Sequence, residues 1–216
     1  MYWQSIICFF AITITAGSSV DLLVRDWKVD GLEKLFVRFG AGLAVVPVMA
    51  VVFNLLQIPL DYRVFLVVGL MILIGAILKN RQSLSARDQS INTSIANSWR
   101  KKSFWYAIVV LILFAVTLAM YLQGAFAYSY FEDTDPWGYA AVVDYIGENK
   151  TFTAPYYSVQ YSEPYTQGYQ IVMGVLSQTN DSVYWTLKFF TALIISFGVP
   201  LMYYLARLLS RDEDIA

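Results

Sequence analysis

Five long apolar segments, separated by polar ones, restrict what this chain can fold into. They are residues 3–20, 39–56, 64–78, 104–122 and 186–206. A helix needs about 20 apolar residues to cross the hydrocarbon core of a bilayer, and a shorter segment gains length from flanking residues that reach the interface. The pattern predicts an all-α, polytopic membrane protein with about five transmembrane helices.

The composition supports this class and excludes several kinds of chemistry. Hydrophobic residues make up 58% of the 216 residues and charged residues only 14%, whereas about a quarter of a soluble domain is charged. The net charge of -1 gives no basic field for a nucleic-acid partner. Histidine is absent and Cys8 is the only cysteine, so acid–base or metal chemistry must rest on carboxylates.

Charged residues between the apolar segments predict which side of the membrane each connection occupies. Residues 21–38 place Leu32, Leu35 and Phe36 at helical spacing among charges, which predicts a short amphipathic helix on the membrane surface. Residues 79–103 are polar and basic, so the positive-inside rule places them in the cytoplasm. The N-terminus and the acidic segment 124–185 are then extracytoplasmic.

This topology divides the chain into three parts. Residues 1–80 form an N-terminal transmembrane part, and residues 81–103 form a basic cytoplasmic loop. Residues 104–216 contain a transmembrane helix, a large outer loop with short amphipathic helices, and a further transmembrane helix. Within that loop, residues 168–176 are apolar but too short to span, so we expect a helix in the outer leaflet or packed on the bundle.

The outer loop opens with acids directly after an apolar segment: Glu132, Asp133 and Asp135. Acids at a membrane surface carry a solvation cost unless water, a metal or a partner meets them. Pro136 disfavours helical backbone at Asp135, and in an extended stretch Asp133 and Asp135 point the same way. Two such carboxylates could bind Mg²⁺ or Mn²⁺, or one could keep a raised pKa and act as a base.

A simpler interpretation of the same residues is also open. Asp135 could cap a helix that has Pro136 at its first position. An apolar stripe supports that helix, made of Tyr139, Val142, Val143 and Ile146. Asp144 lies on the other side of the stripe, and Glu132 and Asp133 could be ordinary solvated loop acids.

Tyrosines crowd the second half of the loop, at positions 156, 157, 161, 165 and 169. Their faces suit the apolar faces of sugar rings, but tyrosine also collects at membrane interfaces, and both interpretations remain open. Two triplets, at Asn149 and Asn180, match the N-glycosylation acceptor pattern, which is short enough to occur by chance.

The loop resembles a known family. The segment Phe131-Glu132-Asp133-Thr134-Asp135-Pro136-Trp137-Gly138-Tyr139 is similar to the first outer loop of the GT-C superfamily of membrane glycosyltransferases, which includes oligosaccharyltransferase catalytic subunits and protein mannosyltransferase-like enzymes. Glu163-Pro164-Tyr165-Thr166-Gln167-Gly168-Tyr169, Leu187-Lys188 and Tyr203-Tyr204-Leu205-Ala206-Arg207 follow in the order seen there. Residues 21–58 also resemble the N-terminal helices of archaeal and bacterial members.

The resemblance implies transfer of a sugar from a polyprenyl-phosphate carrier to an acceptor at the outer face. It gives Asp133 or Asp135 the role of base or metal ligand, with substrate contacts from Glu132, Trp137, Tyr139 and Tyr165. Family members continue for several more helices, so we expect a neighbouring membrane protein or further chain to supply them. The alternative is a non-catalytic membrane subunit that binds or assembles lipid-linked glycans. A transporter is disfavoured because the spans carry no ionisable residue at midplane depth.

Overall fold

The computed structural model describes residues 2–23, 31–84, 96–132, 134–153 and 168–210. These residues form eight helices and no strand, which confirms the all-α fold. Five helical stretches are long and apolar enough to cross a membrane, and they coincide with the five predicted segments: Tyr2–Leu23, Lys34–Leu55, Tyr62–Lys79, Trp105–Ala125 and Val183–Arg207. The chain therefore fits an integral membrane protein.

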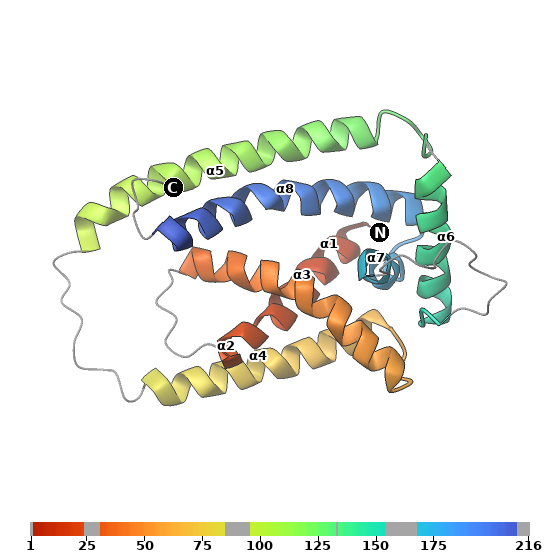
Figure 1. Cartoon of the computed structure of the whole chain (residues 1–216), viewed down its shortest axis with the longest axis horizontal. Helices are drawn as coiled ribbons and strands as arrows, with labels where there is room; N and C mark the ends of the chain where they lie inside the picture. Colours follow the sequence, from red (N-terminus) through yellow and green to blue (C-terminus); the bar gives the residue numbers. More distant parts are fainter. Residues whose placement is uncertain (1, 24–30, 85–95, 133, 154–167, 211–216) are drawn as a thin grey trace.

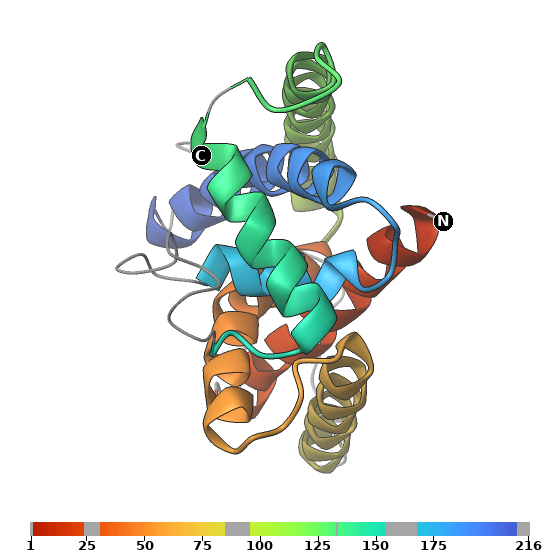
Figure 2. The ribbon, with the colours of Figure 1, turned by 90° about the vertical axis from the view of Figure 1, so that its right-hand side faces the viewer.

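The helices are α1 (Tyr2–Gly17), α2 (Ser19–Leu23), α3 (Gly31–Leu55), α4 (Tyr62–Leu84), α5 (Ala96–Ala125), α6 (Thr134–Asn149), α7 (Gly168–Ser177) and α8 (Val183–Ser210). The long helices run along the length of the molecule, and α6 and α7 lie across the end at which α1 begins (Figure 1). Figure 2 looks onto that end and shows α6 crossing it. We call this end, which also holds the α3–α4 turn, the capped end.

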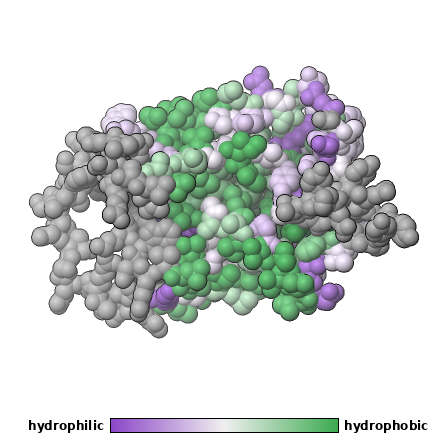
Figure 3. All heavy atoms as spheres, viewed as in Figure 1, coloured by the Kyte–Doolittle hydropathy of each residue, from purple (hydrophilic) through white to green (hydrophobic). Residues whose placement is uncertain are grey.

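A wide hydrophobic band covers the middle of the face seen in Figure 3, and more hydrophilic residues gather toward the capped end. Exposed apolar side chains of α4 and α5 include Val67, Met71, Leu111 and Ile112. Apolar surface of this extent is expected where lipid replaces water as the surrounding medium.

α1 lies at the centre of the N-terminal part and packs against both α3 and α4. Small residues make this close approach possible. A Cβ on Gly17 would come within 3.0 Å of the backbone carbonyl of Arg38, and a Cβ on Gly42 would meet the carbonyl of Thr13 in the same way. Glycine at an interhelical contact is a common device in membrane bundles, where association depends on close packing.

Aromatic rings join α1, α3, α5 and α8 in the core. Phe9 lies against Phe39 and Phe190, with ring centroids 5.6 and 4.9 Å apart. Phe197 of α8 contacts Phe39 at 4.2 Å and Phe114 of α5 at 4.8 Å. α5 otherwise packs mainly along α8, and none of its spanning residues is buried.

The described parts of residues 21–38 contradict the expectation of a separate amphipathic helix, and residues 24–30 lie outside the described residues. α2 follows α1 directly, and α3 begins at Gly31 and continues without a break to Leu55. Asp21 is buried and pairs with Lys34 at 3.2 Å and with Arg38. Asp21 thus has two cationic partners between α2 and α3, so these three charges do not require a helix at the membrane surface.

The two short helices at the capped end agree better with expectation. In α6 the predicted stripe packs inward, with Val142, Val143 and Ile146 buried. α7 is a ten-residue apolar helix, too short to span, and its residues from Gln170 to Ser177 are all buried among the other helices. Its first residue, Gly168, lies against Pro47 of α3.

Candidate functional site

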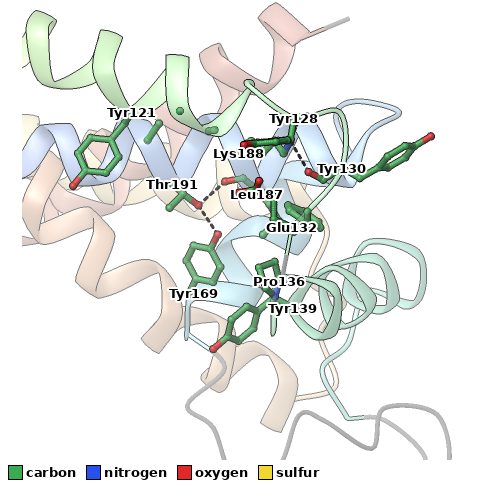
Figure 4. A pocket seen from close by; sticks show the side chains of 14 residues that line it. Tyr121, Tyr128, Tyr130, Glu132, Pro136, Tyr139, Tyr169, Leu187, Lys188 and Thr191 are labelled. Atoms are coloured by element: carbon green, nitrogen blue, oxygen red, sulfur yellow. Dashed lines mark hydrogen bonds between the residues drawn. The ribbon is translucent and has the colours of Figure 1, made fainter. Parts of the chain in front are cut away.

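A cavity of about 440 Å³ lies at the capped end, between α5, α8 and the beginnings of α6 and α7. It is lined by Tyr121, Gly124, Ala125, Tyr128, Tyr130, Phe131, Glu132, Pro136, Tyr139, Tyr169, Leu187, Lys188, Thr191 and Ala192. The spanning helices α5 and α8 provide apolar walls, and the residues that follow α5 carry the only described acid in this lining. Figure 4 shows the arrangement from close by.

Lys188 lies on the α8 wall of the cavity. Its ammonium donates hydrogen bonds to the backbone carbonyls of Tyr128, at 2.6 Å, and Tyr130, at 3.2 Å. It also lies 5.8 Å from the ring centroids of both Phe126 and Phe131, within the range of a cation–π contact. Among the described residues no carboxylate forms an ion pair with Lys188, and the lining of the cavity holds this one ammonium together with the carboxylate of Glu132.

A second polar contact lies deeper along α8. The hydroxyls of Tyr169 and Thr191 are 2.6 Å apart, and Thr191 also donates to the carbonyl of Leu187 (Figure 4). Burial raises the pKa of Tyr169, partly offset by its bond to Thr191. Tyr139 meets the Tyr169 ring edge-on at 6.2 Å. The cavity thus presents neutral hydroxyl groups beside its apolar walls.

Of the six predicted site residues, two line the cavity: Glu132 and Tyr139. Both are solvent-exposed. Asp133 and Tyr165 lie outside the described residues, so their predicted roles stay predictions.

Asp135 and Trp137 are described, but neither is part of the cavity lining. The Trp137 indole donates to the carbonyl of Phe131 at 3.3 Å. Its ring packs against Tyr184 at 5.5 Å and Phe131 at 5.8 Å. These contacts brace the segment that follows α5, and the substrate contact predicted for Trp137 stays a prediction.

The extended backbone expected at Asp135 is not observed. α6 begins at Thr134, so Asp135 lies in the first helical turn and not at the cap position that was the alternative. Proline's effect on the preceding residue is a preference only, and Pro136 loses no hydrogen bond because N–H groups of a first turn have no helical partner. Asp135 is exposed there, at the positive end of the helix dipole.

The described residues give limited support for a metal site. No three side chains of the types Asp, Glu, Cys and His come together within the ranges that the structure covers. Glu132 lines the cavity, whereas Asp135 lies in the first turn of α6 and does not. Asp133, the other predicted ligand of Mg²⁺ or Mn²⁺, lies outside the described residues. The metal expectation remains a prediction for that reason.

Sequence reasoning missed Lys188 and Thr191 as cavity residues. In the sequence Lys188 stands out only as part of the Leu187-Lys188 pair of the resemblance. A usable signal was present: it is the one charged residue in the apolar run 186–206, and it follows an outer loop rich in acids. A single cation placed there needs acceptors, and the nearest loop supplies them as carbonyls.

Comparison of the chain with protein-family models, with curated proteins and with solved structures finds no match. The assignment of a function therefore depends on the geometry of the site and on the resemblance of the loop.

Proposed function

We propose that this chain is a membrane glycosyltransferase of the GT-C type, or the N-terminal part of one. It would transfer a sugar from a polyprenyl-phosphate donor to an acceptor on the extracytoplasmic side. The observation that carries the proposal is the cavity: its walls come from two spanning helices, while hydroxyls, the Lys188 ammonium and the loop acid Glu132 line its end. A lipid-linked sugar has the same division between an apolar chain and a polar head.

The charge distribution supports the sidedness that this function needs. The end of the bundle opposite the cavity holds Lys34, Arg38 and Lys79, and the basic segment 79–103 begins there. The capped end carries the acids Glu132, Asp135, Asp144 and Asp181. A basic end is typical of the cytoplasmic side, so the positive-inside rule favours an extracytoplasmic cavity.

The proposed reaction is a displacement at the anomeric carbon of the donor. Asp133 or Asp135 accepts the proton of the acceptor group as that group forms its bond to the anomeric carbon. The bond between this carbon and the phosphate oxygen breaks, and the lipid phosphate leaves with the electron pair. A divalent cation, when bound, would neutralise charge on the leaving phosphate. Tyr139 and Glu132, on the cavity wall, are placed to contact the sugar.

The position of Asp135 favours a second candidate. It is exposed in the first turn of α6 and does not line the cavity. A chain whose candidate base Asp135 does not line the cavity would suit a non-catalytic subunit that binds lipid-linked glycans for a neighbouring membrane protein.

The test is sugar transfer from a radiolabelled polyprenyl-phosphate donor by membranes containing this chain, with and without the product of the neighbouring reading frame. Asp133→Asn or Asp135→Asn, whichever removes the base, is expected to lower transfer by about a hundredfold or more. Asp144→Asn is the matched control, because Asp144 is an exposed acid on the same helix outside the cavity. Full transfer by the Asp133→Asn/Asp135→Asn double variant contradicts the catalytic role. Donor binding without any transfer, in either setting, supports the subunit instead.

A further inference from the structure

We propose that Lys188 is a positioning residue, which holds the segment 126–132 against α8 and so sets the wall of the cavity on which Glu132 lies. The inference rests on the proposed function in one respect, which is that a substrate contacts this wall. It concerns a residue that the loop resemblance assigns no role.

The contacts of Lys188 all converge on one short segment. Its ammonium bonds two carbonyls, of Tyr128 and Tyr130, and lies near the rings of Phe126 and Phe131. These partners are about 60 residues away in sequence, so the contact joins α8 directly to the segment that follows α5 (Figure 4). Hydrogen bonds from a charged donor are roughly twice as strong as neutral ones.

A lysine that only snorkels would extend its ammonium into water. Lys188 instead gives hydrogen bonds to main-chain oxygens and lies among aromatic rings. The two carbonyls, of Tyr128 and Tyr130, lie beyond the end of α5. The last described hydrogen bond that closes this helix comes from the N–H of Ala127. The ammonium thus donates to two main-chain oxygens that lie outside the helical hydrogen-bond pattern.

The aromatic contacts extend this connection toward α6. Phe131 and Tyr130 pack against Tyr184 of α8, with centroids 5.2 and 6.1 Å apart, and Trp137 of α6 packs on the same ring. Lys188 and Tyr184 lie one turn apart on α8, so the segment is held at two points along one helix face. Glu132 follows Phe131 directly, and its position is fixed by these contacts through the chain.

The experiment measures the position of the segment without any sugar transfer. In a Cys8→Ala background, nitroxide spin labels are attached at Ser129→Cys and Met202→Cys, both exposed positions. Met202 lies further along α8, about 20 Å from Lys188 by helical rise, which suits double electron–electron resonance. A second pair, Glu148→Cys with Met202→Cys, reports on α6 relative to α8.

Three variants separate positioning from general loosening. Lys188→Met keeps the length of the side chain and removes the charge, and it is expected to widen the 129–202 distance distribution at least twofold. Lys188→Arg restores a charged donor and is expected to return the narrow distribution. Lys150→Met is the matched control, because it breaks the Lys150–Asp61 pair at the same end of the bundle without touching the segment.

Widening in Lys188→Met alone, with the 148–202 pair unchanged, supports the proposal. An unchanged 129–202 distribution in Lys188→Met overturns it. Equal widening in Lys150→Met, or no recovery in Lys188→Arg, also overturns it, because either result would mean a general loss of packing. A failed transfer assay leaves these distances unaffected, so the failure of the proposed function is distinguishable.

Discussion

The close crossing of α1 and α3 gives the sharpest prediction for stability. Gly42→Ala adds one Cβ that would fall within 3.0 Å of the backbone carbonyl of Thr13. The obstructing atom belongs to a helix backbone, so a side-chain rotation cannot relieve the clash. The two helices must separate before that Cβ reaches an ordinary contact of 3.4 Å.

The cost of this separation can be placed in a range. A gap of about 0.5–1 Å already removes a quarter to a half of the dispersion energy of the atoms involved. The contacts affected include the Phe9–Phe39 ring pair beside the crossing. Overpacking of a tight core typically costs about 1–3 kcal/mol, and we expect Gly42→Ala to fall in the upper half of that range.

The assay is reversible unfolding of the purified protein in mixed micelles, followed by circular dichroism as denaturing detergent is added. Gly198→Ala on α8 is the matched control, because its Cβ would meet nothing within 4 Å. Alanine also has the higher helix propensity, so this control should be neutral or slightly stabilising. If Gly42→Ala unfolds at the same point as Gly198→Ala, the reasoning from close helix approach is refuted.

Two further predictions concern polar contacts at the capped end. Asn180→Ala should lower the free energy of unfolding by about 1–3 kcal/mol in the same assay. The Asn180 amide donates to the hydroxyls of Ser5 and Thr186, and its oxygen accepts from the N–H of Ser182. Asn149→Ala, at an exposed site, is the control and should change the free energy of unfolding by no more than about 0.5 kcal/mol. Burial alone would raise the pKa of Asp61. The hydrogen bonds from Lys150 and from the N–H of Arg63 outweigh this effect, so the pKa of Asp61 in the folded protein lies below its ordinary value of 3.8. The stabilisation that this lowered pKa gives is present above pH 3.8 and is lost as the pH falls through the folded-state pKa. The melting temperature of the wild type should therefore drop more between pH 5 and pH 3 than that of Asp61→Asn. Equal drops would contradict the assignment.

The membrane spans could be predicted from the sequence because a bilayer imposes a simple requirement. A long apolar run must cross as a helix, so length and hydropathy suffice to find residues such as 104–122. The stripe of α6 was predictable for a similar reason, since Val142, Val143 and Ile146 repeat at helical spacing.

The charged segment 21–38 could not be predicted in the same way. Asp21, Lys34 and Arg38 are far apart in sequence, and their pairing depends on the angle at which α2 meets α3. Periodicity detects one apolar face of one helix, and it carries no information about which charges meet across two helices. The same limitation hid Lys188, whose partners are main-chain carbonyls that no sequence pattern marks.

α5 packs almost entirely on α8, and this affects how a ligand would enter the cavity. One side of the cavity is formed by Tyr121, Gly124 and Ala125, on a helix whose spanning surface touches little except α8. Protein contacts therefore hold this wall mainly through α8. In a bilayer, acyl chains would cover the rest of α5, so a lipid tail that enters the cavity sideways would have to displace only the contacts between α5 and α8.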